Sequence, residues 1–278
     1  LLSGGLLKPI RRLTQASQAL ARGDLQQQVP VTSQDELGLL TSTFNQMSAD
    51  LAQADQQRKR LTADITHDLS TPLQIISGYI EMLEENEVTL TPQRIEIIKT
   101  EIGHLRRLVD DLSTLTQAEA SGLDIQAQPV QPAALLECIY HTYQPIAAQQ
   151  GVMLVLDLPE STPSIMVDED RILQVLKNLV DNALRYTPQG GSIILSVVVG
   201  DRVQIKVTDS GSGIEAADLP HVFDRFYRAD PSRGGSSGKM GLGLAICKAL
   251  VTAQAGEISA KSTGKGQGAS IVITFNPC

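Results

Sequence analysis

The chain has 278 residues, which is enough for about two domains. Hydrophobic residues make up 42% of it and aromatic residues only 3%, with no tryptophan, so any core must be aliphatic. The formal net charge of −8 argues against a broad nucleic-acid-binding surface. The three cysteines have no CxxC spacing, which argues against a disulfide framework and against a cysteine metal site.

The first seven residues, Leu1 to Leu7, are apolar apart from one serine and two glycines. No apolar run in the sequence is long enough to cross a bilayer by itself. Residues 1–7 are therefore interpreted as the end of a transmembrane helix or as a flexible leader, and the sequence leaves both open.

Residues 8–53 carry two amphipathic helical patterns, separated by an irregular connector from Arg22 to Gln34. Each helix is too short to be stable alone. A connector of this length allows the helices to run parallel, and a second copy of the chain would complete a four-helix bundle. A plain helical hairpin is the alternative. The positions of the two patterns are Ile10, Leu13, Ser17 and Leu20, then Leu37, Leu40, Phe44, Met47 and Leu51.

Residues 54–119 form a second helical module. His67 lies off the apolar stripe of its helix and should face water, with Asp68 beside it. Thr71 follows one turn later on the same face. Pro72 removes a backbone hydrogen bond and should bend the helix near His67. Neutral imidazole is a nucleophile near pH 7, so His67 is a candidate catalytic residue, with an ordinary surface histidine as the alternative.

The second helix of this module should begin with Thr91 as N-cap and Pro92 as its first residue. The short connection predicts an antiparallel hairpin, and a dimer would bury both apolar stripes in a four-helix bundle. The helical pattern also continues from Leu51 into Leu61. A rotation or tilt of the first module could therefore reach His67 through one helix.

Helical and strand-like segments mix after Ser121. Residues 120–131 are interpreted as a linker, and residues 132–278 as a domain with helices on one face of a mixed sheet. We expect helices at 133–150, from the capping residue Asp168 through Tyr186, and at 241–255, and strands at 152–158, 165–167, 193–199, 202–208, 257–261 and 269–275.

One helix of this domain carries Asn178 and Asn182 at positions i and i+4, so their amides share a face. Asparagine is a mediocre helix former, so two on one face need a reason. Neutral oxygens that bind Mg²⁺ without repelling phosphate would be one. A pair of ordinary surface amides is the alternative.

A second stretch, D-S-G-S-G, follows a predicted strand. Asp209 at the strand end can accept a hydrogen bond from an exocyclic amine. Gly211 and Gly213 would let the backbone approach a flat ring closely. Such a string is often only a turn.

A third stretch, from Gly234 to Leu244, runs from glycines and serines into a helix N-terminus at about Gly241. Backbone N–H groups and the helix dipole favour phosphate there, and Lys239 adds positive charge. We interpret the flexible part as a lid over nucleotide, with a disordered linker as the alternative.

In this order and spacing, these segments resemble the sensor histidine kinases over essentially the whole chain. The implied fold is multidomain: an all-α parallel coiled-coil HAMP bundle, an antiparallel helical hairpin that forms a dimeric four-helix bundle, and an α/β sandwich of the GHKL ATPase type. The matching segments are the HAMP module (Pro9, Asp35–Gly38 and Phe44–Met47), the phosphoacceptor box (His67–Pro72), the N box (Asn178–Tyr186), the first glycine box (Asp209–Gly213), the phenylalanine box (Phe223–Tyr227) and the second glycine box (Gly241–Gly243).

The resemblance implies ATP and Mg²⁺ as cofactors. His67 would be the phosphoacceptor, Asp68 its base or orienting group, and Thr71 the residue that positions water for regulator dephosphorylation. The implied partners are a second copy of the chain and the receiver domain of a response regulator. An inner-membrane protein with this part in the cytoplasm is implied as well. The implied ATP-binding residues are Asn178 and Asn182 (both also for Mg²⁺), Arg185, Tyr186, Asp209, Gly211, Gly213, Lys239, Gly241, Leu242 and Gly243.

The sequence departs from the family pattern at a few positions. Ser70 stands where the family has a basic residue, Lys239-Met240 replaces Gly-Thr, and Gln254-Ala255 replaces His-Gly. Two other functions therefore stay open. One is a phosphatase-biased or nucleotide-binding adaptor with weak kinase activity, and the other is a GHKL ATPase or scaffold for which His67 is incidental.

Overall fold

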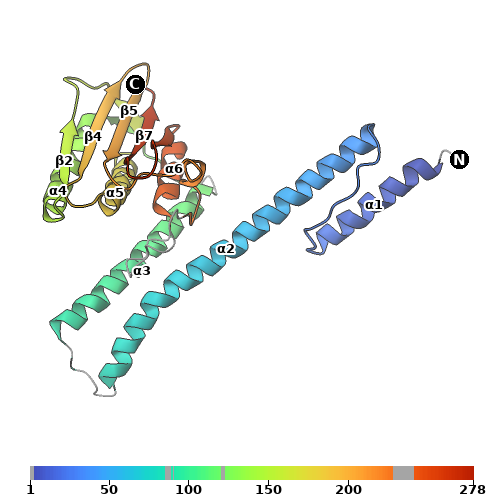
Figure 1. Cartoon of the computed structure of the whole chain (residues 1–278), viewed down its shortest axis with the longest axis horizontal. Helices are drawn as coiled ribbons and strands as arrows, with labels where there is room; N and C mark the ends of the chain where they lie inside the picture. Colours follow the sequence, from blue (N-terminus) through green and yellow to red (C-terminus); the bar gives the residue numbers. More distant parts are fainter. Residues whose placement is uncertain (1–2, 85–88, 90, 120–122, 228–240) are drawn as a thin grey trace. The chain divides into compact units, whose positions relative to one another are not determined.

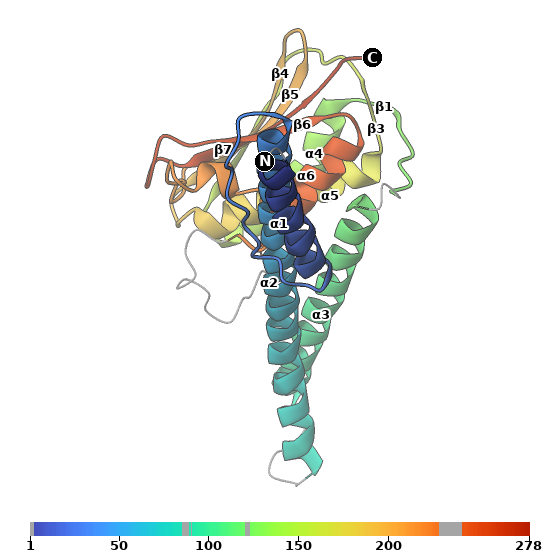
Figure 2. The same ribbon diagram turned by 90° about the vertical axis from the view of Figure 1, so that its right-hand side faces the viewer.

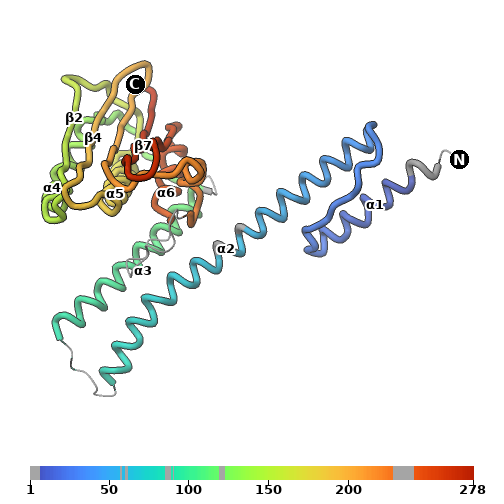
Figure 3. Tube along the Cα trace, viewed as in Figure 1, coloured from blue at the N-terminus to red at the C-terminus, as the bar shows by residue number. Residues whose placement is uncertain are grey.

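The computed structural model describes the whole chain except residues 1–2, 85–88, 90, 120–122 and 228–240 (Figure 1). Its contacts divide the chain into two units, Leu1–His67 and Asp68–Cys278. Figure 2 shows the elements from a second side, and Figure 3 follows their Cα path.

In the first unit, α1 (Ser3–Ala21) and the beginning of α2 (Glu36–Glu84) lie side by side and run in the same direction (Figures 1 and 2). The carboxylate of Asp35 starts α2 by accepting hydrogen bonds from the backbone N–H groups of Leu37 (3.0 Å) and Gly38 (3.2 Å). A hydrogen bond with Ser33, followed by these backbone bonds, lowers the pKa of Asp35.

The connector between α1 and α2 is held along α2 by side chains of that helix. The Asn45 amide pairs with the backbone of Val29, donating to its carbonyl and accepting from its N–H, both at 2.8 Å. The Ser48 hydroxyl donates to the Leu25 carbonyl at 3.0 Å. These bonds satisfy connector backbone groups that no sheet or helix pairs. The predicted parallel helices are therefore confirmed, and a plain hairpin is excluded; Leu13, Ala16, Val29 and Phe44 form the core between them.

Helix α2 is continuous from Glu36 to Glu84 and contains Pro72. The continuity predicted from Leu51 into Leu61 is confirmed, because one helix crosses the boundary expected between the two modules at residue 53. α3 (Pro92–Glu119) begins as predicted, with Thr91 Oγ1 accepting from the N–H of Arg94 at 3.4 Å, and returns antiparallel to the end of α2 (Figure 1). Within the described ranges, every helix is too short or too polar to span a membrane.

The rest of the second unit contains a five-stranded sheet in the order β2-β4-β5-β7-β6. β2 and β4 are parallel, and the other neighbours are antiparallel. Alternate residues of β4 and β5 are buried, as the period of a strand requires when one face is covered. The strands are β2 (Met153–Asp157), β4 (Ser192–Val199), β5 (Val203–Asp209), β6 (Glu257–Lys261) and β7 (Ala269–Phe275).

Three helices, α4 (Pro132–Gln149), α5 (Glu169–Tyr186) and α6 (Gly243–Ala253), pack together over the sheet. A short 3₁₀ helix (Leu219–His221) precedes the phenylalanine box. The aliphatic core expected from the composition lies between these layers, and its largest fully buried side chains are Leu135, Leu136, Ile139, Ile165, Ile172, Leu176, Leu179, Ile193, Leu195, Ile205, Leu242 and Ile246.

Two local expectations need correction. The segment interpreted as a linker contains strand β1 (Gln128–Val130), which pairs antiparallel with β3 (Ile165–Val167). Its central residue is Pro129, which a two-stranded edge tolerates because not every N–H faces a partner. Helix α6 begins at Gly243 and not at Gly241, which has a left-handed φ of +69°.

Asp168→Ala should destabilise the sheet domain by about 1 kcal/mol, the usual cost of losing an N-cap. Asp168 Oδ1 accepts from the N–H of Arg171 at 3.1 Å, and Oδ2 accepts from the N–H of Gln126 at 3.0 Å. Asp170→Ala removes the same charge from the first turn of α5 without removing the cap. Chemical denaturation should therefore show a larger loss for Asp168→Ala, and equal losses would contradict the capping role.

Candidate functional site

The predicted phosphoacceptor segment lies on α2. His67 is exposed, as the sequence predicted, Asp68 is half-buried and Thr71 is exposed one turn later. A shallow depression beside the imidazole is lined by residues of the same helix, namely Arg58, Lys59, Thr62, Ala63, Thr66 and His67.

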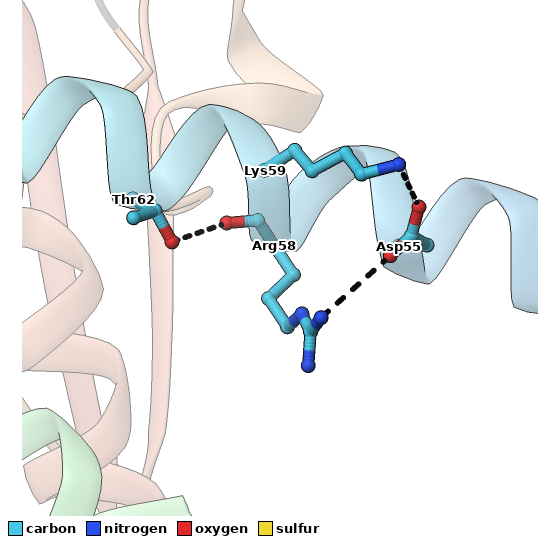
Figure 4. A network of polar contacts seen from close by, with 4 residues as sticks. All are labelled: Asp55, Arg58, Lys59 and Thr62. Carbon is cyan, nitrogen blue, oxygen red and sulfur yellow. Dashed lines mark hydrogen bonds and ion pairs between the residues drawn. The ribbon is translucent and has the colours of Figure 1, made fainter.

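A charged network lies one to three turns before His67 (Figure 4). The Asp55 carboxylate contacts Lys59 Nζ at 2.7 Å and the Arg58 guanidinium at 3.9 Å, and Thr62 Oγ1 donates to the Arg58 carbonyl at 3.0 Å. The hydrogen bond from Lys59 is the main cause that lowers the pKa of Asp55. The side chains of Arg58 and Lys59 therefore give this depression two cations.

A cavity of about 670 Å³ lies between α5, the end of β5 and the start of α6. Part of its wall comes from α3, including Thr100, His104 and Asp111. Gly211 lies in the loop behind the wall, and Lys239 lies outside the described residues. The remaining predicted ATP-binding residues all line the cavity: Asn178, Asn182, Arg185, Tyr186, Asp209, Gly213, Gly241, Leu242 and Gly243.

Asp209 ends β5, as predicted. Its Oδ1 accepts hydrogen bonds from the backbone N–H groups of Gly211 (2.8 Å) and Ala269 (3.3 Å). Burial raises the pKa of the Asp209 carboxyl, and the two backbone hydrogen bonds oppose that rise. Because both bonds go to Oδ1, Oδ2 is the oxygen that can serve a ligand.

The two glycines after Asp209 are required by the protein's own backbone as well as by any ligand. A Cβ on Gly211 would collide with the Tyr186 carbonyl and lie 2.8 Å from Asp209 Oδ1. Gly213 has a φ of +67°, and a Cβ there would collide with the Gly264 carbonyl. The sequence suggested only the approach of a flat ring, so the structure adds a second reason for glycine.

Asn178 and Asn182 both line the cavity from α5. The Asn178 side-chain nitrogen is buried and has no hydrogen-bond partner within the described residues, which is the situation expected of an amide that serves a ligand. The described part of the chain contains no cluster of three His, Cys, Asp or Glu side chains that could hold a metal ion. The side-chain oxygens of Asn178 and Asn182 are donors that suit Mg²⁺ bound together with phosphates.

Between its two asparagines, α5 is joined to α4 by a hydrogen bond. The Tyr143 hydroxyl of α4 donates to Asp181 Oδ1 at 2.9 Å. Burial, followed by the negative charge of Asp181, raises the pKa of Tyr143, so its hydroxyl remains a donor at neutral pH. At the cavity end of α5, the Arg185 guanidinium lies 5.8 Å from the centre of the Tyr186 ring.

The start of α6 is fixed against the phenylalanine box. A Cβ on Gly241 would lie 2.7 Å from the Tyr227 carbonyl, so glycine is required there. The Tyr227 hydroxyl in turn donates to Asp218 at 2.6 Å. The first N–H groups of α6 have no partner within the helix, as at every helix start, and they lie at the cavity.

The segment Ser262–Ala269 was not singled out from the sequence, although it contacts the Asp209 loop throughout. The N–H of Gly266 donates to the Ser212 carbonyl at 2.6 Å, and that of Gly268 donates to the Gly211 carbonyl at 3.1 Å. Alternating glycines just before β7 were the signal that could have identified it.

Three family models match the chain in the order expected. They are the HAMP domain at residues 1–53, the His Kinase A (phospho-acceptor) domain at 57–121, and the histidine kinase-, DNA gyrase B- and HSP90-like ATPase at 167–277.

Curated relatives match most of this chain. The signal transduction histidine-protein kinase BaeS of Escherichia coli (strain K12) is 39% identical over 274 residues, which is 98% of this chain and 58% of BaeS. The sensor histidine kinase WalK of Bacillus subtilis (strain 168) is 34% identical over 227 residues, covering 80% of this chain and 37% of WalK. The chain thus spans less than two thirds of the length of these relatives.

Solved structures of histidine kinases share the fold of this chain. The histidine kinase AdeS of Acinetobacter baumannii superimposes with a TM-score of 0.63 at 27% identity, covering 76% of this chain and 98% of AdeS. The histidine kinase ThkA in complex with the response regulator protein TrrA shows the same fold, with a TM-score of 0.61 at 20% identity, covering 82% of this chain and 66% of that one. With its HAMP, phosphoacceptor and ATPase domains in this order, the chain belongs to the sensor histidine kinases of two-component systems.

Proposed function

We propose that the protein phosphorylates itself on His67 from ATP and passes the phosphoryl group to an aspartate of a response regulator. The observation that carries this proposal is the cavity that gathers the predicted nucleotide residues of α5, β5 and α6 in one domain. The exposed His67 on the helix that matches the phosphoacceptor domain supports it.

Each wall of the cavity suits one part of the nucleotide. Asp209 Oδ2 would accept from the adenine 6-amino group, and the N–H groups at the start of α6 would bind phosphate. Asn178 and Asn182 would hold Mg²⁺, which, when bound, neutralises charge on the phosphates. Arg185, Tyr186 and Lys239 are proposed nucleotide contacts as well.

The phosphoryl transfer is an in-line displacement. The unprotonated ring nitrogen of neutral His67 would form a bond to the γ-phosphorus as the bond to the ADP oxygen breaks, and the proton on the other ring nitrogen would pass to Asp68. The resulting phosphohistidine would give its phosphoryl group to an aspartate carboxylate of the regulator. The positive surface formed by Arg58 and Lys59 beside His67 suits an acidic partner of this kind.

A homodimer is part of the same proposal. Apolar residues of the hairpin helices remain exposed in the single chain, including Leu73 (51%), Ile102 (52%) and Val109 (57%). Exposed apolar residues repeated along helices indicate an interface, and a second hairpin would cover them in a four-helix bundle. Attachment to the inner membrane through a preceding segment, with this part in the cytoplasm, is also proposed, and the HAMP match supports it.

The decisive experiment incubates the protein with Mg²⁺ and γ-labelled ATP, beside His67→Ala and Asn182→Ala. Label that is acid-labile and base-stable should appear in the wild type and in neither variant. His67→Ala should still bind nucleotide, because His67 does not line the cavity.

Label that persists in His67→Ala would overturn the assignment of the phosphoacceptor. Unlabelled wild-type protein that still binds ATP would favour the adaptor function. Release of phosphate without labelled protein would favour a GHKL ATPase.

Regulator phosphatase activity is a second proposed function, because exposed Thr71 follows His67 by one turn of α2. Thr71→Ala should remove the hydroxyl that positions water and slow regulator dephosphorylation about tenfold or more, while autophosphorylation is retained. Dephosphorylation of a labelled regulator in the presence of ADP would measure this. Thr142→Ala, on the exposed face of α4, is the control and should leave both activities unchanged.

A further inference from the structure

We propose that Ser262 is a positioning residue for adenine recognition. Its hydroxyl locks the turn Gly264–Gly268 against the loop Asp209–Ile214 and so fixes the Asp209 carboxylate. The inference rests on the proposed binding of adenine by Asp209. It adds a residue that directly follows β6 and does not itself line the cavity.

The Ser262 hydroxyl uses its full hydrogen-bonding capacity between these two segments. It accepts from the N–H of Ile214 at 3.0 Å and from that of Gly264 at 3.3 Å. It donates to the Gly268 carbonyl at 2.7 Å, nearer than the Gly264 carbonyl at 3.4 Å. A hydroxyl has one proton and two lone pairs, so this arrangement is saturated. No side chain without a hydroxyl reproduces it.

The turn held by Ser262 contacts Asp209 directly. A Cβ on Gly268 would collide with the Asp209 carbonyl, so the two backbones are in close contact. The next residue, Ala269, donates its N–H to Asp209 Oδ1 at 3.3 Å, and Gly268 donates to the Gly211 carbonyl at 3.1 Å. A shift of the turn would therefore move one of the two donors that orient the carboxylate.

Loss of the Ser262 hydroxyl should mainly weaken recognition of the adenine base. Losing the Ser262 hydroxyl releases the N–H of Ile214 and lets the turn move, so Asp209 Oδ2 is less well aimed at the 6-amino group. Contacts to ribose and phosphates arise from α5 and α6 and should remain. Adenine selectivity should fall more than nucleotide binding as a whole.

The test compares ADP with inosine diphosphate, which carries an oxygen in place of the 6-amino group. Dissociation constants with Mg²⁺ would be measured calorimetrically on the whole chain for wild type, Ser262→Ala, Ser262→Thr, Asp209→Ala and Ser259→Ala. Ser259 is exposed on the same strand and is the matched control.

Ser262→Ala should lower the affinity for ADP about tenfold and change that for inosine diphosphate by less than about twofold. Ser262→Thr keeps the hydroxyl and should restore most of the selectivity. Equal losses for both nucleotides, together with a lower Tm, would show a general structural role and overturn the inference. Unchanged selectivity in Ser262→Ala would also overturn it.

Asp209→Ala separates this failure from failure of the proposed function. If it loses selectivity and Ser262→Ala does not, only the role of Ser262 is wrong. If the wild type shows no preference for ADP and Asp209→Ala changes nothing, the adenine assignment is wrong and the inference falls with it.

Discussion

Asp209→Asn is expected to lower the affinity for ATP about 100-fold, because a hydrogen bond to adenine becomes a contact between two donors. The backbone N–H groups of Gly211 and Ala269 both donate to Oδ1. The asparagine oxygen must stay at that position to satisfy them. The NH₂ group then occupies the place of Oδ2 and faces the 6-amino group of adenine. The substitution preserves shape but reverses the hydrogen-bonding character of the atom that meets the ligand.

The same variant should be at least as stable as wild type without nucleotide. Burial raises the pKa of Asp209, so the fold disfavours its charged form, and a neutral amide avoids that cost. Isothermal titration with ATP analogues and thermal unfolding of the free protein would measure both effects. Reduced affinity together with a lower Tm would indicate misfolding and contradict this account. Asp201→Asn, the same substitution in the exposed turn between β4 and β5, provides the control for affinity.

Affinity for ATP should also fall on acidification earlier than an ordinary aspartate would cause. Burial raises the pKa of Asp209 above its ordinary value in the free protein. Adenine requires the ionised carboxylate, so binding is full above the raised pKa and is lost as pH falls through it. For folding the sign is opposite, since a raised carboxyl pKa means that ionisation at higher pH costs stability. Titrations with ADP over a series of decreasing pH values would measure the loss, and a loss that sets in only at the ordinary pKa of an aspartate would contradict it.

The elements of the ATPase domain could be predicted from the sequence because the hydrophobic periodicity agrees there with the residues that begin and end each helix and strand. Asp168 caps α5, the alternating residues of β4 and β5 are buried, and Ile165–Val167 forms the predicted strand. Strand β1 was missed because Pro129 stands at its centre and proline normally argues against a strand. The sequence predicted that the helix continues from Leu51 into Leu61. It did not predict a single helix from Glu36 through Pro72 to Glu84, because a helical pattern alone does not show that two modules share one helix.

The site could be predicted where a residue's own chemistry marks it. Asn178, Asn182 and Asp209 were identified as polar side chains in places that stability alone does not explain, and all three line the cavity. The contribution of Ser262 could not be predicted, because Ile214 precedes it by 48 residues and meets it only when β7 pairs with both β5 and β6. The start of α6 was placed two residues early because a glycine before a helix gives no sign of its φ.

Gly213→Ala should impair both the fold and nucleotide binding. Its φ of +67° costs an L-residue about 1 kcal/mol, and the added Cβ would collide with the Gly264 carbonyl. The backbone displacement that relieves such a collision typically lowers the free energy of unfolding by a further amount of about 1–3 kcal/mol. Since Gly264 belongs to the turn that Ser262 holds, the displacement would separate the two segments that orient Asp209. We therefore expect at least about a tenfold loss of affinity for ADP, equivalent to about 1.4 kcal/mol.

Gly190→Ala is the matched control for that variant. Gly190 has a similar φ of +84°, but a Cβ there meets no atom within 4 Å. It should show the cost of the left-handed backbone alone, with a lower Tm and unchanged affinity for ADP. The relevant unfolding transition is the one that ADP shifts upward, because a ligand stabilises only the domain that binds it. If Gly190→Ala and Gly213→Ala lowered this transition and the affinity equally, the contact between Gly213 and Gly264 would have no special part in the site. A larger loss of both Tm and affinity for Gly213→Ala would instead show that the loop Asp209–Ile214 and the turn Gly264–Gly268 act as one unit.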